Sequence, residues 1–237
     1  ALIKKEDKNY GLIDLRQFYF DMQNYKERNA ASDVKKEIIR LKKEGMEGLI
    51  IDLRGNGGGS LRTAVDMAGL FIKEGPIVQV ASSGSKKEVL NDNDDEIVWN
   101  GPLVILINEL SASASEIVSG AIQDNDRGLI IGRRSFGKGL VQEQIRLPDG
   151  SVMRLTTQRY YTPSGRCIQK DYGKNSKEYF LEQYTRNEQL QKYDTLEYKT
   201  KEGRLVYGGG GITPDIRINR DTTLNYFPIN NVNCSTT

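Results

Sequence analysis

The chemistry open to this chain is limited by its lack of histidine. None of the 237 residues is a histidine, which excludes His-containing triads, HExxH zinc sites and imidazole bases. The two cysteines, Cys167 and Cys234, are too few for a disulfide scaffold or a cysteine-rich zinc site. Catalysis must therefore use Ser, Lys, Tyr, Asp, Glu or Cys. For a serine nucleophile, the practical base that remains is a lysine whose charged form is disfavoured by burial.

Lys138 is the best candidate for such a lysine. It lies in RSFGKGLVQ between Gly137 and Gly139, with the apolar Phe136 and Leu140 beyond them. Glycines allow the backbone to approach closely, and the apolar neighbours would keep water away. Taken alone, however, a lysine between two glycines is more often an ordinary turn residue than a base.

Two further motifs could supply a nucleophile and an anion-binding site. The small-residue run SASAS, residues 111–115, begins a helical pattern, where serines more often cap and pack than react. The glycine-rich GNGGG, residues 55–59, follows an apolar strand. It could cradle a phosphate, form a tight strand-to-helix turn or offer backbone N–H groups to an oxyanion. Neither motif is specific in isolation.

A nucleotide site is a rival interpretation of the glycines around Lys138. Residues 132–139 match the P-loop spacing GxxxxGK, but Gly139 stands where a Ser or Thr would bind magnesium. The following residues, LVQEQIRL, predict a strand and not the helix of a P-loop. Both departures weigh against nucleotide binding.

The elements that must position these motifs are alternating apolar strands and helices. Strands are predicted at 10–18, 48–54, 77–82, 103–108 and 128–132, and helices at 32–44, 61–72 and from near Ser113. This alternation predicts an α/β domain with a partly parallel sheet, in which ligands collect beyond the carboxyl ends of strands. GNGGG and SASAS both occupy such ends, which first suggests an active site.

The remaining segments predict surface and edge structure. The polar stretch 82–96 is expected to be a solvated loop, and the Pro-Asp-Gly turn at 148–150 predicts a β-hairpin. The charged segment 170–205 predicts short helices and loops on the surface. A glycine turn at 208–211 leads to a short strand, and the tail from Arg220 carries no prediction.

Composition is ordinary for a globular protein. The chain is 37% hydrophobic and 28% charged, and 34 basic against 32 acidic residues give a net charge of +2. Such a small excess argues against a nucleic-acid partner. The longest apolar run, 103–107, is far below the roughly 20 residues that cross a bilayer. The start has no apolar targeting region and no Met, so a targeting segment would have to lie upstream.

Together, DLRGNGGGS, SASASEI followed by IQDN, and RRSFGKGLVQ, in this order and spacing, resemble the C-terminal processing (tail-specific) peptidases of family S41. The resemblance covers roughly residues 10–170 and GGGGITPDI near the end. It implies a ClpP/crotonase-like α/β fold with a mixed, partly parallel sheet, and a single catalytic domain over 1–237. It also implies a serine endopeptidase that cleaves protein or peptide substrates through an acyl-enzyme and needs no metal or other cofactor.

The same resemblance assigns the reacting groups. In the family, the nucleophile is the middle serine of SASAS and the base is the lysine of FGKG, 25 positions later. Ser113 and Lys138 stand 25 positions apart in this chain. The family's glutamine four residues after the lysine corresponds to Gln142, which would orient the lysine amine.

Three further roles follow from the resemblance. The backbone N–H groups of Gly59 and Ala114 would form an oxyanion hole, with Gly58 as the alternative because the donor within residues 57–59 is uncertain by one position. Ala114 would lie at a helix N-terminus, whose dipole favours a developing negative charge. Asp124, within IQDN, would be a supporting carboxylate, although it could also be a simple helix-end residue.

Partners and location are likewise implied by the resemblance. Family members usually carry an upstream PDZ module that captures the substrate's carboxyl terminus by strand addition, and this sequence is expected to begin just after such a module. Family members of this kind act in the bacterial periplasm or cell envelope. Nothing in the sequence sets the oligomeric state. The rival hypothesis is a catalytically silent peptide-binding domain of the same fold, against which the intact Ser113, Lys138 and Gln142 argue.

Overall fold

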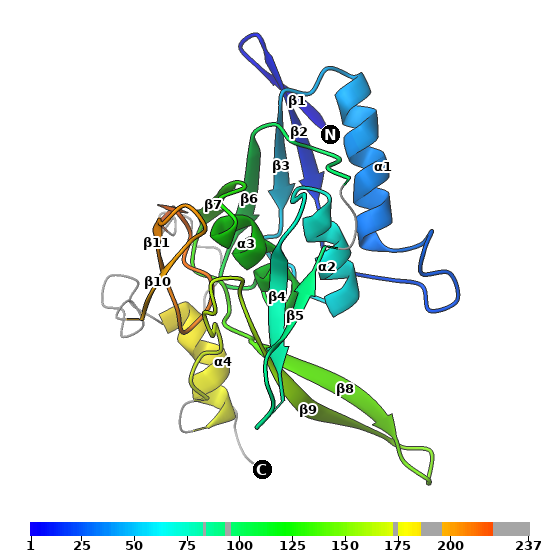
Figure 1. Cartoon of the computed structure of the whole chain (residues 1–237), viewed down its shortest axis with the longest axis vertical. Helices are drawn as coiled ribbons and strands as arrows, with labels where there is room; N and C mark the ends of the chain where they lie inside the picture. Colours follow the sequence, from blue (N-terminus) through cyan, green and yellow to red (C-terminus); the bar gives the residue numbers. More distant parts are fainter. Residues whose placement is uncertain (83, 93–95, 173–174, 186–195, 220–237) are drawn as a thin grey trace, which may run out of the picture.

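A six-stranded mixed sheet forms the centre of the molecule (Figure 1). The computed structural model describes residues 1–82, 84–92, 96–172, 175–185 and 196–219. The strands, in their order across the sheet, are β1 (Leu2–Lys5), β2 (Lys8–Asp14), β3 (Gly48–Asp52), β6 (Leu103–Ile107), β7 (Leu129–Gly132) and β12 (Ile216–Arg217). Only β1 pairs antiparallel with its neighbour; the other pairs are parallel. The predicted α/β fold with a mixed, partly parallel sheet is confirmed.

The central strands β3 and β6 are apolar, and one of their faces is fully buried. Leu49, Ile51 and Ile105 share that face and are almost completely buried, whereas Ile50 and Val104, on the opposite face, are half-buried. The two strands are paired with Asp52 opposite Leu106. Their carboxyl ends are therefore adjacent, and the two motifs that follow them, GNGGG and SASAS, begin side by side.

Three helices lie beside one another over this sheet, as Figure 1 shows. They are α1 (Ala30–Lys43), α2 (Leu61–Gly69) and α3 (Ala114–Asp124). The middle helix, α2, packs against both α1 and α3. Every residue of α3 is buried, whereas α1 buries one stripe. The helix that begins at the SASAS run is thus the most enclosed of the three.

The first helix begins earlier than its sequence pattern predicted. Asn29, not Ser32, caps α1: its side-chain oxygen accepts the N–H of Ser32 at 2.9 Å, and the Ser32 hydroxyl accepts the N–H of Asn29 at 3.3 Å. This reciprocal pair satisfies two N–H groups that a helix start leaves open. The prediction placed the serine at the cap because the third position of a capping box also favours a hydrogen-bonding side chain.

A second, antiparallel sheet carries a long hairpin. Its strands are β5 (Glu88–Asn91), β4 (Pro76–Ala81), β9 (Val152–Tyr161) and β8 (Leu140–Arg146), in that order. The β8–β9 ribbon, joined by the predicted turn at 148–150, projects from the body of the molecule (Figure 1). The loop predicted at 82–96 is wrong in part, because β5 forms there. Its charged and polar residues are tolerated on an edge strand that faces solvent.

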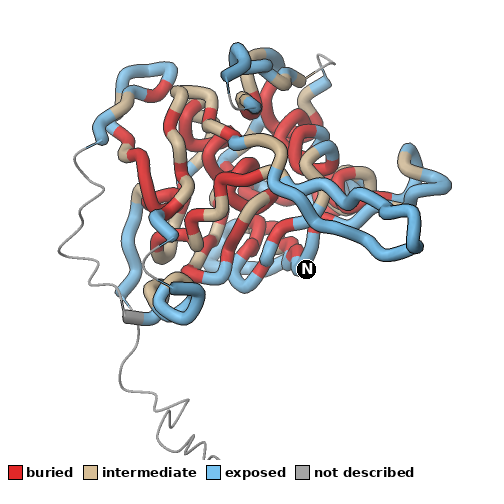
Figure 2. The backbone as a smooth tube through the Cα atoms, turned by 90° about the horizontal axis from the view of Figure 1, so that it is seen from below, coloured by how far each residue is buried: buried red, intermediate tan, exposed pale blue. Residues whose placement is uncertain are grey.

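The C-terminal part of the described chain adds short elements. These are α4 (Ser176–Thr185) and the antiparallel pair β10 (Glu197–Lys199) and β11 (Leu205–Tyr207). Within the predicted charged segment, residues 173–174 and 186–195 lie outside the described residues, as does the tail from Arg220. Burial is concentrated in the middle of the molecule (Figure 2). Within the described residues, no helix has the length and apolar character to cross a membrane.

Candidate active site

The SASAS run exposes one of its three serines to a cavity. Ser111 and Ser115 are fully buried; their hydroxyls donate to the carbonyl oxygens of Leu53 at 2.8 Å and Asn56 at 2.9 Å. The half-buried Ser113 lines a cavity of about 730 Å³. The outer serines therefore hold the run against the end of β3, and Ser113 is the one that a substrate could reach.

Ser113 has an unusual backbone conformation at the start of α3. Its φ of 57° and ψ of −113° lie in a region that favours glycine. Such a conformation costs free energy and persists only where the surroundings enforce it, which happens most often at active sites. Here the Ser113 N–H donates to Oε2 of Glu116 at 2.8 Å, one turn into the helix.

Glu116 joins the segment of Ser113 to that of Lys138. Its carboxylate is fully buried. Oε1 accepts the Ser135 hydroxyl at 2.5 Å and the Gly137 N–H at 2.7 Å. Oε2 accepts the N–H of Lys138 at 2.9 Å in addition to that of Ser113. One side chain thus fixes the backbone of both candidate reacting residues.

The electrostatics of Glu116 reflect two opposing effects. Burial raises the pKa of its carboxyl above the ordinary value, and the four hydrogen bonds oppose that rise. An ionised carboxylate has acceptor sites for all four donors, whereas a protonated one would face at least one of them with its own hydrogen. The four-donor arrangement is therefore satisfied by the charged form.

Tyr160, at the end of β9, makes a second connection between the same segments. Its hydroxyl donates to the carbonyl oxygen of Lys138 and lies 3.2 Å from that of Ser113. The side chain is almost completely buried. Burial, followed by the nearby charge of Glu116, raises the pKa of Tyr160 well above 10, so the hydroxyl keeps its proton and remains a donor.

Lys138 and Gln142 line the same cavity as Ser113. Lys138 is half-buried in the loop that leads into β8, and Gln142 is an exposed residue of that strand. The chain continues from the lysine into a strand, as predicted, and not into the helix that a P-loop needs. The structure therefore gives the nucleotide interpretation no support.

The glycine-rich loop approaches Ser113 and Phe18 too closely for any side chain. A Cβ on Gly58 would lie 2.7 Å from the Cβ of Ser113, and one on Gly59 would lie 2.2 Å from the carbonyl oxygen of Phe18. Both glycines also have positive φ angles, 103° and 146°. Main-chain bonds fix the loop, because the Phe18 N–H donates to Gly58 at 3.0 Å and its carbonyl accepts the Ser60 N–H at 2.9 Å.

The backbone N–H groups around Ser113 differ in whether they already donate a hydrogen bond. That of Gly58 donates to Oδ1 of Asn56 at 2.8 Å. Those of Gly57, Gly59 and Ala114 have no acceptor in the part of the chain that the structure describes. Among the predicted oxyanion donors, Gly59 and Ala114 are thus open, and the alternative Gly58 is occupied.

A second, more apolar cavity of about 460 Å³ adjoins the first and shares Lys138, Gln142 and Arg154 with it. Its walls include Phe136 of the lysine's loop and Phe180 of α4. The buried Lys170 anchors α4 there: its Nζ donates to the carbonyl oxygen of Tyr179 at 2.7 Å and lies 3.9 Å from the centre of the Phe136 ring. The helix and the lysine's loop therefore form one wall.

Asp124 lies apart from the other predicted site residues, at the C-terminal end of α3. It forms an ion pair with Arg166 in which both side chains are buried. Nearby, Arg204 bridges Asp126 at 2.5 Å and Asp215 at 2.8 Å. Asp124 lines neither of the two cavities described above. The structure thus gathers the other predicted residues at the start of α3 and places this one at its far end.

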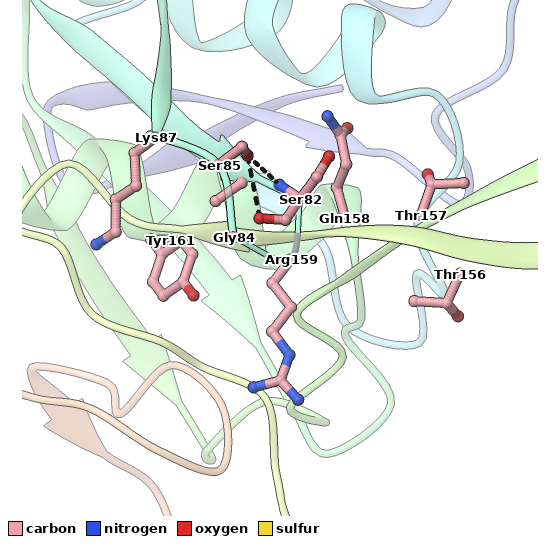
Figure 3. Close-up of a pocket in the computed structure, with 10 residues that line it drawn as sticks. Ser82, Gly84, Ser85, Lys87, Thr156, Thr157, Gln158, Arg159 and Tyr161 are labelled. Carbon is pink, nitrogen blue, oxygen red and sulfur yellow. Dashed lines mark hydrogen bonds between the residues drawn. The ribbon is translucent and has the colours of Figure 1, made fainter.

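A third cavity, of about 620 Å³, contains none of the predicted residues (Figure 3). Ser82 and Ser85 bond to each other at its edge, and Lys87, Arg159 and Tyr161 also line it. No polar side chain of the Ser113 site reaches it. Across the described ranges, no group of three or more His, Cys, Asp or Glu side chains is placed to hold a metal ion.

Three residues that shape the site were not predicted from the sequence. Glu116 and Asn56 lie within the recognised motifs, and a glutamate three residues into a helix that starts with serine is a capping-box signal that could have been noticed. Tyr160 gives no such signal, because it reaches the site only through the pairing of β8 with β9.

Comparison with known proteins agrees with the motifs. The sequence model of peptidase family S41 matches residues 9–175. The chain is 40% identical over 175 residues to the tail-specific protease of Haemophilus influenzae, covering 70% of this chain and 24% of that protein. It is 38% identical over 160 residues to the carboxyl-terminal-processing protease of a Synechocystis strain, covering 68% of this chain and 35% of that protein.

The fold is similar to that of a solved protease. The photosystem II D1 C-terminal processing protease superposes with a TM-score of 0.64 at 29% identity, over 89% of this chain and 42% of that one. The chain spans between 24% and 39% of the length of the curated relatives that it matches. From its three motifs, its fold and the match over most of its length, the chain belongs to peptidase family S41.

Proposed function

We propose that this chain hydrolyses peptide bonds of protein substrates as a serine endopeptidase, with Ser113 as nucleophile and Lys138 as base. One observation carries the proposal: Ser113, the one serine of SASAS that is not fully buried, shares a cavity with Lys138 and Gln142, beside N–H groups that have no acceptor in the described chain. The family membership and the printed names of its relatives support the same activity.

The reaction proceeds by acyl transfer. Neutral Lys138 takes the proton of the Ser113 hydroxyl, and Oγ attacks the carbonyl carbon of the substrate. The tetrahedral intermediate collapses, the C–N bond breaks, and the departing amine receives the proton from Lys138. Water, deprotonated in turn by Lys138, then hydrolyses the ester and regenerates Ser113. Gln142 orients the lysine amine during these steps.

The negative oxygen of the intermediate is bound by backbone N–H groups. The resemblance assigns this role to Gly59 and Ala114, whose N–H groups are open among the described residues, as is that of Gly57, while that of Gly58 is taken by Asn56. Ala114 adds the favourable end of the α3 dipole. Asp124 supports the site indirectly, by anchoring the other end of that helix through Arg166.

C-terminal processing of proteins is proposed as the biological reaction. It rests on the relatives, which are named as tail-specific or carboxyl-terminal-processing proteases. The apolar cavity between Phe136 and Phe180 would suit an apolar side chain next to the cleaved bond. Location in a bacterial periplasm or cell envelope, and an upstream PDZ module, are further proposals from the same resemblance, and fractionation of cells would test the first.

The test is cleavage of an unstructured polypeptide with an apolar C-terminus by wild type, Ser113→Ala and Lys138→Ala at matched purity. Both substitutions are expected to abolish cleavage. Matched controls are Ser119→Ala, on the same helix, and Lys73→Ala, an exposed lysine of the described surface. Both controls should cleave like wild type.

Two other outcomes would speak against the proposal. Cleavage that survives in both Ser113→Ala and Lys138→Ala would indicate a contaminant or a different site. Absence of cleavage by wild type would favour the rival, a silent peptide-binding domain, unless cleavage returned when an upstream PDZ module was supplied.

A further inference from the structure

The larger cavity at Ser113 is lined by basic side chains. Arg62, Lys138 and Arg154 all contribute to its wall, and none of the described residues that line it is acidic. The chain as a whole has 34 basic and 32 acidic residues, so this local excess does not follow from composition. A cleft with charge of one sign attracts a group of the opposite sign.

Arg62 lines the cavity and has no carboxylate partner in the described part of the chain. It lies in the first turn of α2, where no acidic residue is present and where the helix dipole disfavours a cation. Its guanidinium lies 4.0 Å from the centre of the Tyr25 ring, a cation–π contact that fixes its position. Asp66, one turn further along, accepts the Tyr25 hydroxyl at 2.6 Å and forms no ion pair with Arg62.

Arg154 enters the same cavity from the β8–β9 hairpin. It is paired directly opposite Gln144, two residues beyond Gln142 along β8, and all three residues line the cavity; Arg154 and Gln142 also line the adjoining apolar cavity. Within the described residues, Arg154 has no ion pair. Other arginines of this chain do, such as Arg54 with Asp52 at 2.6 Å. Two arginines from different elements thus line one cavity, and neither guanidinium has a hydrogen-bond acceptor among the described residues.

We propose that Arg62 and Arg154 bind a carboxylate of the substrate close to the bond that Ser113 attacks. The inference deepens the proposed function and rests on it. A guanidinium offers a carboxylate two parallel N–H donors, which gives both affinity and orientation. The groove therefore selects substrates by charge, in addition to the apolar side chain received by the neighbouring cavity.

The register of the hairpin sets where that carboxylate must lie. Arg154 lies opposite Gln144, which is two residues beyond Gln142 on β8. This spacing is about 7 Å along the strand at roughly 3.3 Å per residue. An extended substrate advances by the same rise, which places the carboxylate about two to four residues from the cleaved bond. It can be the α-carboxylate of a chain end or the side chain of an Asp or Glu.

Three forms of one peptide separate these sources. An unstructured apolar peptide whose cleavage site has been mapped by mass spectrometry is made with a free C-terminus, with an amidated C-terminus, and amidated with one Glu within four residues of the bond. The kcat/KM of wild type and the Kd of Ser113→Ala are measured for each. We expect a carboxylate to improve both by about tenfold over the amidated, acid-free peptide.

The arginines are then replaced singly by Gln, which keeps much of the stem and removes the charge. Arg62→Gln and Arg154→Gln are expected to bring the ratio between acidic and acid-free peptides close to one. Arg159→Gln is the matched control, because this residue belongs to β9 but lines the separate cavity of Figure 3. The preference of wild type should also weaken between roughly 0.1 and 1 M salt, since exposed charges are screened.

Each outcome has a defined meaning. A gain from the free C-terminus alone assigns the groove to chain ends, and a gain from Glu assigns it to acidic residues. Equal binding and cleavage of all three peptides would overturn the inference and leave the proposed function intact, as would an equal loss in Arg159→Gln. If no peptide is bound or cleaved, the proposed function itself fails. Comparable unfolding curves for the three variants confirm that they fold.

Discussion

The two ends of helix α3 make different contacts with the rest of the molecule. At the start, Ser113 has a strained backbone and the Ala114 N–H has no acceptor in the described chain. At the end, Asp124 forms a fully buried ion pair with Arg166, next to the bridge from Arg204. The comparison indicates that the ion-paired end fixes the helix, so that the other end can keep Ser113 in an unfavourable backbone conformation.

The largest expected effect on stability comes from removing the ion pair between Asp124 and Arg166. Arg166→Met leaves the Asp124 carboxylate buried without its partner, and we expect the unfolding free energy to fall by about 3–5 kcal/mol. Chemical denaturation measures it. Arg16→Met is the control, because both side chains of its ion pair with Asp14 are largely exposed, 72% and 43%, and the loss should be about 1 kcal/mol or less. Equal losses in the two variants would mean that burial of the ion pair does not set its importance.

The next effect concerns the open end. Glu116→Gln replaces one acceptor oxygen by an NH₂ group, so one pair of its four donors loses its partner. A shift of the Ser113 or Lys138 backbone by about 1 Å would lower kcat/KM by roughly 100-fold. Stability should change by less than about 2 kcal/mol, because removing a buried charge offsets part of the loss. Steady-state kinetics and denaturation on the same preparation separate the two quantities.

A large loss of stability with little loss of kcat/KM would contradict this role of Glu116. If Glu116→Gln unfolded easily but retained its kcat/KM while folded, Glu116 would serve the core and not the site. The conservative Glu116→Asp provides a second check, since it keeps the charge and moves it back by one methylene.

A smaller effect of opposite sign is expected at Ser113. Ser113→Gly is expected to abolish cleavage, and to relieve a strain of about 1–3 kcal/mol while adding about 1 kcal/mol of unfolded-chain entropy. We expect a net gain of about 1 kcal/mol in unfolding free energy. Ser119→Gly, in the middle of the same helix, should instead lose about 0.5–1 kcal/mol. A loss at both positions would show that the Ser113 backbone is not strained.

The last effect is a dependence of stability on pH. Burial raises the pKa of Glu116, so between its ordinary value near 4.5 and the raised one the folded chain holds a proton that the unfolded chain has released. The contribution of Glu116 to the unfolding free energy is therefore fully present below about pH 4.5. It is lost as the pH rises through the raised pKa that Glu116 has in the folded chain. The unfolding free energy of wild type minus that of Glu116→Gln should fall over this window. A flat or rising difference would exclude the raised pKa.

Sequence reasoning identified the local parts of this site. Ser113, Lys138 and Gln142 were assigned through motifs, and the structure brings them to one cavity. The alternating strands and helices were recognisable because buried parallel strands have continuous apolar runs. Their carboxyl ends carry the motifs, as the pattern predicted.

The non-local parts could not be predicted in the same way. The role of Glu116 depends on the loop at 135–138 folding back onto α3, and that of Tyr160 depends on the register of a hairpin. Asp124 was assigned by resemblance, but its distance from the cavity follows only from the length of the helix. Strand β5 was missed because an edge strand tolerates charges that otherwise indicate a loop.

The contact between Phe18 and the glycine-rich loop has a consequence for how such a site can change. Both of its hydrogen bonds join main-chain atoms, so they do not themselves require phenylalanine at position 18, whose side chain is held by burial in the core. The geometry of the open Gly59 N–H is therefore set by the path of the chain at residue 18, and the sequence records the contact only at Gly59, where a Cβ would meet the Phe18 carbonyl oxygen. Aligned sequences would show the glycine without its partner, and redesigning the contact would require a proline or a change in loop length between β2 and α1.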